Sequence, residues 1–168
     1  QKLTVSENLH AALMALRLFE QFLWIDAICI NQEDLVERNQ QVSLMNAIYR
    51  SADSVIAWLG PEGDDSQFAI ETMERWKIRI TQRSETTKKD YWNTVAAITP
   101  SDPAFYGPPG TTPHRAWLAI KKIWERSWWS RAWIVQEATL AGSRHLSLMC
   151  GKDYVYWDDF AVAIDVAD

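Results

Sequence analysis

Residues 23–32, with the sequence LWIDAICINQ, constrain the fold of this 168-residue chain more than any other segment. They form a nearly unbroken apolar run that ends abruptly in polar residues. Such a run is typical of a strand covered on both faces, as in a parallel sheet with helices on either side. We therefore expect residues 23–30 to form a buried strand. Asn31 and Gln32 then emerge at its carboxyl end, where open α/β sheets bind ligands.

Asp26 is a carboxylate inside this apolar run. Burial of a charged group is costly unless the group has hydrogen-bond partners. We expect Asp26 to be mostly buried and to accept hydrogen bonds from backbone N–H groups or from Arg38. Arg38 lies at the edge of the apolar stripe of a predicted helix over residues 33–51, where the alternative is a solvent-exposed face with local ion pairs.

Strands and helices alternate along the rest of the chain. Apolar runs predict strands at residues 54–59 and 146–150, and we expect the first of these to lie parallel to residues 23–30. The spacing of apolar residues predicts helices at residues 7–20, 33–51, about 65–80, 114–125 and 158–166. This alternation favours a single α/β domain over residues 1–168, with a mostly parallel sheet flanked by helices. Residues 81–113 are expected to be an insertion or loop.

Composition and charge argue against several classes of function. The net charge of −5 and the pI of about 5.2 disfavour a nucleic-acid surface, which needs a basic patch. No apolar run approaches the roughly 18 residues that a membrane span needs. The two cysteines and three histidines are widely spaced, which predicts neither a disulfide framework nor a metal site. The scattered glycines form no phosphate-binding loop, so we expect no bound cofactor. No secretory signal opens the chain, and we expect a cytoplasmic location.

A second group of candidate residues lies in the tryptophan-rich segment at residues 126–141. Trp133 and Glu137 are four residues apart and share one face of a predicted helix. Partial burial among aromatic side chains raises the pKa of a carboxyl group toward values that suit acid–base or nucleophilic catalysis. The alternative is a structural ion pair between Glu137 and Arg38, Arg131 or Arg144. The residue types and their spacing leave both interpretations open.

The order of three sequence blocks carries a family resemblance. The blocks are LWIDAICINQ at residues 23–32, the spaced apolar and charged residues between 37 and 60, and RSWWSRAWIVQE at residues 126–137. Together they resemble the fungal heterokaryon-incompatibility (HET) domain, over roughly residues 6–157. The family's usual opening strand, approximately Ala-Leu-Ser-Tyr-x-Trp-Gly, has no counterpart before Ser6, so the sheet is expected to lack its first strand. Membership implies a role in triggering cell death after incompatible hyphae fuse.

HET domains are similar to Toll/interleukin-1-receptor (TIR) domains, which have a flavodoxin-like parallel sheet. Several TIR domains cleave NAD⁺ at the nicotinamide–ribose bond through a helix glutamate, in a pattern that reads approximately Trp-Cys-x-x-Glu. Residues 133–137 keep the Trp and the Glu of this pattern but lack the Cys. The resemblance therefore implies that Glu137 is the catalytic residue and that Trp133 forms one wall of its cleft.

If the domain binds NAD⁺, the residues expected to bind or orient it are Asp26, Asn31 and Gln32, at or near the end of the predicted strand, together with Arg38 and Arg131. Either arginine suits a bidentate contact with the pyrophosphate of NAD⁺, which would be a substrate and not a cofactor. We expect Glu137 to lie within about 12 Å of Asn31 or Gln32, given strand spacings of roughly 4.8 Å. The competing hypothesis is a non-enzymatic module that signals by self-association or through other death-signalling domains. The polar residues of the motifs would then be structural.

Overall fold

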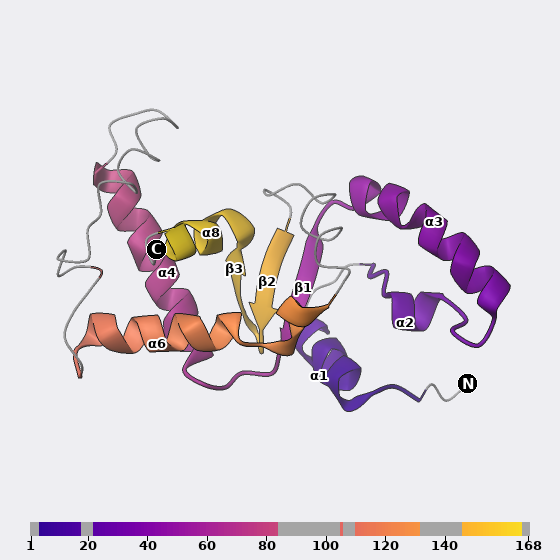
Figure 1. Cartoon of the computed structure of the whole chain (residues 1–168), viewed down its shortest axis with the longest axis horizontal. Coiled ribbons are helices and arrows are strands. Elements are labelled where there is room, and N and C mark those ends of the chain that lie inside the picture. Colours follow the sequence, from indigo (N-terminus) through magenta and orange to yellow (C-terminus); the bar gives the residue numbers. More distant parts are fainter. Residues whose placement is uncertain (1–3, 18–21, 84–104, 106–109, 132–145, 166–168) are drawn as a thin grey trace.

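The computed structural model describes residues 4–17, 22–83, 105, 110–131 and 146–165 (Figure 1). The first described elements are α1 (Glu7–Leu16), α2 (Asp26–Cys29), α3 (Leu35–Ser51), β1 (Val55–Gly60) and α4 (Ser66–Arg83). They are followed by α6 (Thr112–Trp124), the 3-10 helix η1 (Ser127–Ser130), β2 (Leu146–Cys150), β3 (Asp153–Tyr156) and α8 (Trp157–Asp165).

The described strands form a small sheet in the order β1-β2-β3. β1 and β2 are parallel, with Val55 beside Leu146 and Ala57 beside Leu148. β2 and β3 are antiparallel and are joined by a tight turn in which Gly151 has a φ of 60°. The predicted strands at residues 54–59 and 146–150 are confirmed, and the described fold is mixed α/β with helices flanking the sheet.

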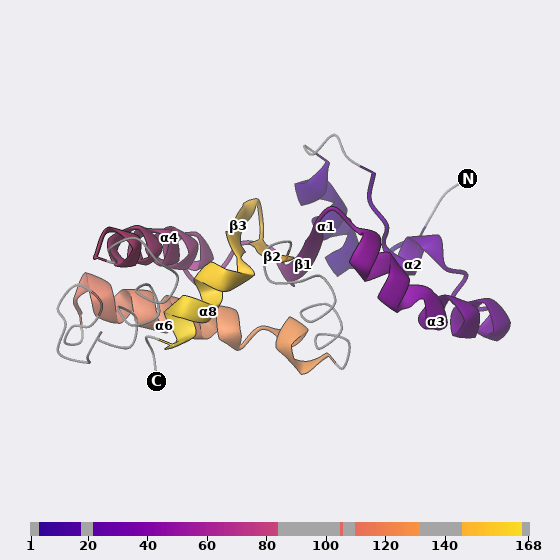
Figure 2. The same cartoon turned by 90° about the horizontal axis from the view of Figure 1, so that it is seen from above.

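The core lies between this sheet and helices α4, α6 and α8, which gather on the same side of the molecule (Figures 1 and 2). Met73 and Ile80 of α4, Ile120 of α6 and Phe160 of α8 are at most 1% exposed. Aromatic rings join the helices, because the ring of Trp76 lies 4.8 Å from that of Trp117 across the α4–α6 contact. Such ring pairs add about 0.5–1.5 kcal/mol beyond the burial of their area.

The prediction of a buried strand at residues 23–30 is wrong. Ile25 is extended, and α2 begins at the next residue because the Ile25 carbonyl accepts the N–H groups of Ile28 and Cys29, at 2.9 and 2.8 Å. These local bonds take the place of a strand ladder, and no described strand lies beside this segment. Leu23 and Trp24 are 39% and 38% exposed. The expected parallel pairing with residues 55–59 is therefore wrong too.

The predicted helices form with shifted ends. Ser6 caps α1, since its Oγ accepts the N–H of Leu9 at 3.2 Å. Asp34 caps α3 through its Oδ1, which accepts the N–H groups of Val36 and Glu37 at 2.9 and 3.1 Å. α4 continues to Arg83 and so takes in the start of the predicted insertion at residues 81–113, of which 84–104 and 106–109 lie outside the described residues.

Helices α2 and α3 lie beyond β1, on the side of the molecule away from α4, α6 and α8 (Figures 1 and 2). Met45 is the buried residue of α3, whereas Leu35 is 60% exposed although it belongs to the apolar stripe of this helix. Within the described part of the chain, no helix has both the length and the apolar character needed to cross a membrane.

Candidate functional site

Four of the predicted site residues, Asp26, Gln32, Arg38 and Arg131, line one pocket of about 160 Å³. Its apolar lining consists of Ile30, Val42, Met45 and Tyr49. Asp26 belongs to α2, Gln32 to the turn after it, Arg38 to α3, and Arg131 directly follows η1. The structure therefore brings Arg131 together with three residues from a much earlier part of the sequence, and we call this cavity the α3 pocket.

The α2–α3 turn builds one wall of the α3 pocket through its own hydrogen bonds. The Gln32 side-chain amide donates from Nε2 to the backbone carbonyl of Asp26 at 3.0 Å. The Asp26 carboxylate accepts the N–H of Ala27 at 2.7 Å. The prediction that Asp26 is mostly buried is wrong, because it occupies the exposed first turn of α2. A carboxylate there is stabilised by the positive end of the helix and by water.

Asn31 does not line the pocket; its hydrogen bonds stabilise the neighbouring turn. Its Oδ1 accepts the N–H of Glu33 at 3.2 Å, and its own N–H donates to the carboxylate of Glu37 at 3.1 Å. A short polar side chain that bonds to the backbone two residues later is typical of a turn. Asn31 therefore shapes the connection from α2 to α3.

The charges of the α3 pocket favour an anion. Arg38 and Arg131 face one carboxylate, that of Asp26, around a lining that is otherwise neutral. Neither guanidinium group forms a hydrogen bond or ion pair with another described residue, so among the described residues nothing competes with a ligand for them. A guanidinium group suits phosphate and carboxylate because it can donate two parallel hydrogen bonds. A volume of about 160 Å³ is below the roughly 300 Å³ of a typical small-molecule site, so the pocket fits one anionic group of a ligand.

Trp133 and Glu137 lie outside the described residues, so the structure does not test their roles or the expected distance from Glu137 to Asn31 or Gln32. Arg131 is the last described residue before them. Within the described part of the chain, no group of three or more His, Cys, Asp or Glu side chains is arranged to hold a metal ion.

A second region, at the carboxyl end of parallel strand β1, was missed by the reasoning from sequence. The loop from Gly60 to Ser66 borders two cavities, of about 520 and 360 Å³. The larger cavity is also lined by Asn8, Lys122 and Arg126. The Gly60-Pro61 pair that ends the strand is the signal that could have located this region, because ligands in open α/β sheets meet the carboxyl ends of strands.

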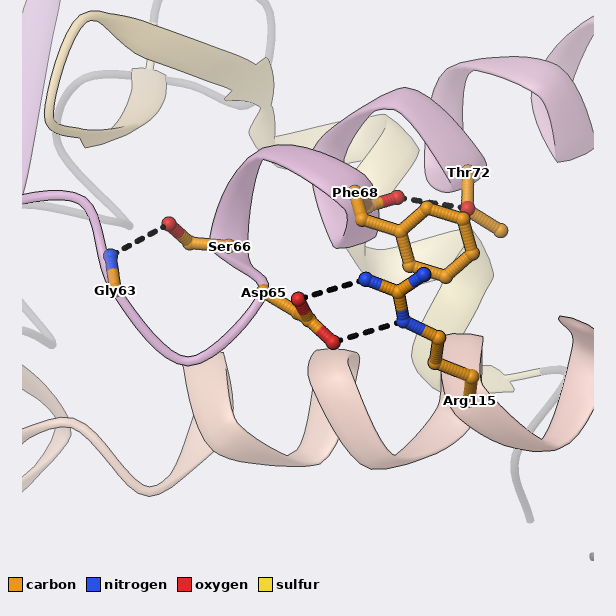
Figure 3. A network of polar contacts seen from close by, with 6 residues as sticks. All are labelled: Gly63, Asp65, Ser66, Phe68, Thr72 and Arg115. Atoms are coloured by element: carbon orange, nitrogen blue, oxygen red, sulfur yellow. Dashed lines mark hydrogen bonds and ion pairs between the residues drawn. The ribbon is translucent and has the colours of Figure 1, made fainter. Parts of the chain in front are cut away.

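The smaller cavity is bordered by an ion pair between α6 and the start of α4 (Figure 3). Arg115 donates from Nε and Nη2 to the two carboxylate oxygens of Asp65, at 2.9 and 2.8 Å. The Arg115 guanidinium also lies over the ring of Phe68, 4.4 Å from its centre. Hydrogen bonding to Arg115 lowers the pKa of Asp65, and the same bond raises the pKa of Arg115. The pair joins α6 to the turn that precedes α4. Because its two charges neutralise each other, it leaves little net charge for a ligand.

Comparison with known proteins gives one consistent result. A family model described as "Heterokaryon incompatibility protein (HET)" matches residues 1–137. The chain is also similar to "Heterokaryon incompatibility protein 6, OR allele" of Neurospora crassa, with 35% identity over 129 residues. This match covers 70% of the chain but 19% of the Neurospora protein. No solved structure matches.

Proposed function

The chain belongs to the heterokaryon incompatibility (HET) family, and from this premise we propose that it acts in fungal non-self recognition as an effector that cleaves NAD⁺. In this proposal the domain works in the cytoplasm and contributes to cell death when incompatible hyphae fuse. The chain spans about a fifth of the curated relative that it matches, so the activity proposed is that of this domain and not of a whole protein.

The α3 pocket is the observation that supports ligand binding. It gathers two arginines without described partners beside the LWIDAICINQ block. We assign the pyrophosphate of NAD⁺ to Arg38 and Arg131, because paired phosphates offer several acceptor oxygens to two planar donors. The pocket is too small for a whole dinucleotide, so the adenosine and the nicotinamide riboside would extend from it along the surface.

The proposed reaction breaks the bond between C1′ of the ribose and the nicotinamide nitrogen. The bonding electrons leave with neutral nicotinamide, and the ribosyl cation that forms is stabilised by the carboxylate of Glu137. Water then adds to C1′ and releases a proton, which gives ADP-ribose. Trp133 would pack against the reacting ring. These two roles are assigned from the sequence and its resemblance to TIR domains.

The purified chain, incubated with NAD⁺, tests this proposal through the release of nicotinamide. We expect Glu137→Gln to lose nearly all turnover, and we expect Arg38→Gln to raise KM. Arg50→Gln is the matched control, because Arg50 is an exposed arginine of the same helix that does not line the pocket. A wild-type chain that is folded but releases no nicotinamide would rule out NAD⁺ cleavage by this domain.

A second candidate function is signalling by self-association, and exposed apolar side chains favour it. Leu35, Val36 and Leu44 of α3 are 60%, 67% and 50% exposed. Large apolar side chains left exposed along one helix can mark an interface with another protein. Under this hypothesis wild-type protein should sediment as an oligomer, and Val36→Glu should sediment as a monomer. Leu118→Glu is the control, since Leu118 is 53% exposed on α6, which lies on the other side of the sheet from α3 (Figures 1 and 2).

A further inference from the structure

Residues 22–51, which we call the α2–α3 unit, pack little against the other described helices and strands, and Tyr49 is the side chain of this unit that packs against the main core. Ile30 and Met45 are the buried residues of this unit. Neither α2 nor α3 makes an extensive contact with another described helix or strand, whereas β1, β2, α4, α6 and α8 pack against one another. Both views show α3 extending away from the sheet (Figures 1 and 2). Elements with so little buried area are expected to open and move easily.

The α3 pocket lies at the junction between this unit and the remainder of the domain. Seven of its eight lining residues belong to the α2–α3 unit, and the eighth is Arg131. Arg131 is held on the other side by η1: its N–H donates to the Trp128 carbonyl at 3.1 Å, and Trp128 is 2% exposed in the core. Trp129 adds a second attachment, because its Nε1 donates to the Ile123 carbonyl of α6 at 2.9 Å.

The two arginines of the pocket therefore come from two groups of described elements that make few other contacts with each other, apart from the packing of Tyr49 against the core. Without a ligand, the one carboxylate of the pocket, that of Asp26, leaves the two positive charges of Arg38 and Arg131 only partly balanced. An anion between the two arginines supplies the missing negative charge and accepts charge-assisted hydrogen bonds from both sides. The bound anion then favours the arrangement in which both arginines contact it, and that arrangement in turn favours binding of the anion.

We propose that a phosphate-bearing ligand in the α3 pocket, bound between Arg38 and Arg131, fastens the α2–α3 unit to the sheet-bearing part of the domain. The occupied pocket would thereby set the position of α3 and of its exposed apolar side chains. The inference rests on the proposed function only for the identity of the ligand. A dinucleotide and a free phosphate compound share the chemistry required here.

Hydrogen exchange of the full chain, measured by mass spectrometry, tests the fastening directly. The probe is inorganic pyrophosphate, compared with sodium chloride at equal ionic strength. At a pyrophosphate concentration 100 times its Kd, exchange in α3 should slow by up to about 100-fold, because the ligand lowers the population of the opened unit in that proportion. Exchange in α4 and α6 should stay unchanged. Pyrophosphate that fails to bind, or that binds without slowing exchange in α3, overturns the proposal.

Variants separate a specific site from general screening of charge. Arg38→Gln and Arg131→Gln should each abolish the protection of α3, whereas Arg50→Gln should retain it. Protection that survives in either pocket variant contradicts the proposal. A parallel series with ADP-ribose identifies the source of the phosphate: stronger protection than with pyrophosphate indicates a dinucleotide, and equal protection indicates a phosphate group alone.

This experiment is independent of turnover. If the chain releases no nicotinamide from NAD⁺ but pyrophosphate still protects α3, the proposed reaction fails and the fastening stands. If the chain cleaves NAD⁺ and α3 is not protected by pyrophosphate or ADP-ribose, the reaction stands and the fastening fails.

Discussion

Arg126 is bound to the backbone of Gly63, because its Nη2 donates to the Gly63 carbonyl at 3.0 Å. The same guanidinium donates from Nη1 to the carbonyls of Pro61 at 2.8 Å and Leu59 at 3.4 Å. One side chain from the start of η1 thus holds the loop that leaves β1. This loop needs support, since Asp64 and Asp65 both have positive φ, a conformation that costs a non-glycine residue energy.

Replacement of Arg126 should therefore destabilise the whole domain. Hydrogen bonds to a charged group each contribute about 1.5–3 kcal/mol, and they are not fully additive. We expect Arg126→Met to lower the free energy of unfolding by about 2–4 kcal/mol, as measured by urea denaturation. Arg126→Lys should lower the free energy of unfolding by most of the same amount. A lysine ammonium group lacks the planar, forked guanidinium that donates to three carbonyls at once. Exposed Arg50→Met is the control, and an equal midpoint for Arg126→Met and wild type would contradict the prediction.

A side chain at Gly151 should destabilise the domain. Its φ is 60°, and an added Cβ would lie 2.9 Å from Cβ and 3.0 Å from the backbone nitrogen of Glu62. We expect Gly151→Ala to cost about 2–4 kcal/mol, since backbone strain and overlap both contribute. Gly110→Ala is a matched control: Gly110 has a φ of 86°, but nothing lies within 4 Å of the added Cβ. It should cost about 1–2 kcal/mol. Equal costs in thermal unfolding would show that the contact with Glu62 is irrelevant.

Local rules explain which parts of the fold were predictable from sequence. The apolar runs that form β1 and β2 are strands because each has a neighbour with which to pair. Residues 23–30 are equally apolar, yet they lack such a neighbour among the described strands, and local bonds around Ile25 form α2 instead. Apolar composition thus indicates that a segment can be a strand, and only a pairing partner makes it one.

The candidate site was also predictable from sequence only in part. Asp26, Gln32 and Arg38 are close in sequence, so a turn between two helices is enough to bring them together. Arg131 is distant from them in sequence and reaches the pocket only in the folded domain, where it directly follows η1. Sequence motifs pointed to each residue but gave no distances. The roles of Arg126 and of the Gly60 loop were missed because Arg126 binds backbone carbonyls. Every residue has a backbone carbonyl, so the sequence does not indicate which ones a side chain will bind.

The two cysteines should differ sharply in reactivity. Cys29 is exposed at the end of α2, whereas Cys150 is buried at the end of β2. Burial raises the pKa of the Cys150 thiol, which lowers its thiolate fraction near neutral pH. We expect a thiol reagent such as DTNB to modify one cysteine rapidly in the folded protein and two after denaturation. Cys29→Ser should remove the rapid phase and Cys150→Ser should not. A rapid phase that persists in Cys29→Ser would contradict the assignment.

Acid should weaken the contact between α4 and α6 through Asp65. The Arg115 guanidinium holds the pKa of Asp65 below its ordinary value, chiefly by hydrogen bonding. A carboxyl group whose pKa is lowered in the folded state contributes its full stabilisation at any pH above its pKa in the unfolded chain, which is about 4. This contribution disappears as the pH falls through the lower pKa of the folded state. Between pH 5 and the acid limit of folding, Asp65→Asn should therefore lose less stability than wild type, as followed by the denaturant midpoint at each pH. Asp64→Asn, the control at the neighbouring carboxylate, should keep the wild-type slope. Parallel slopes for Asp65→Asn and wild type would show that the pair with Arg115 does not contribute in solution.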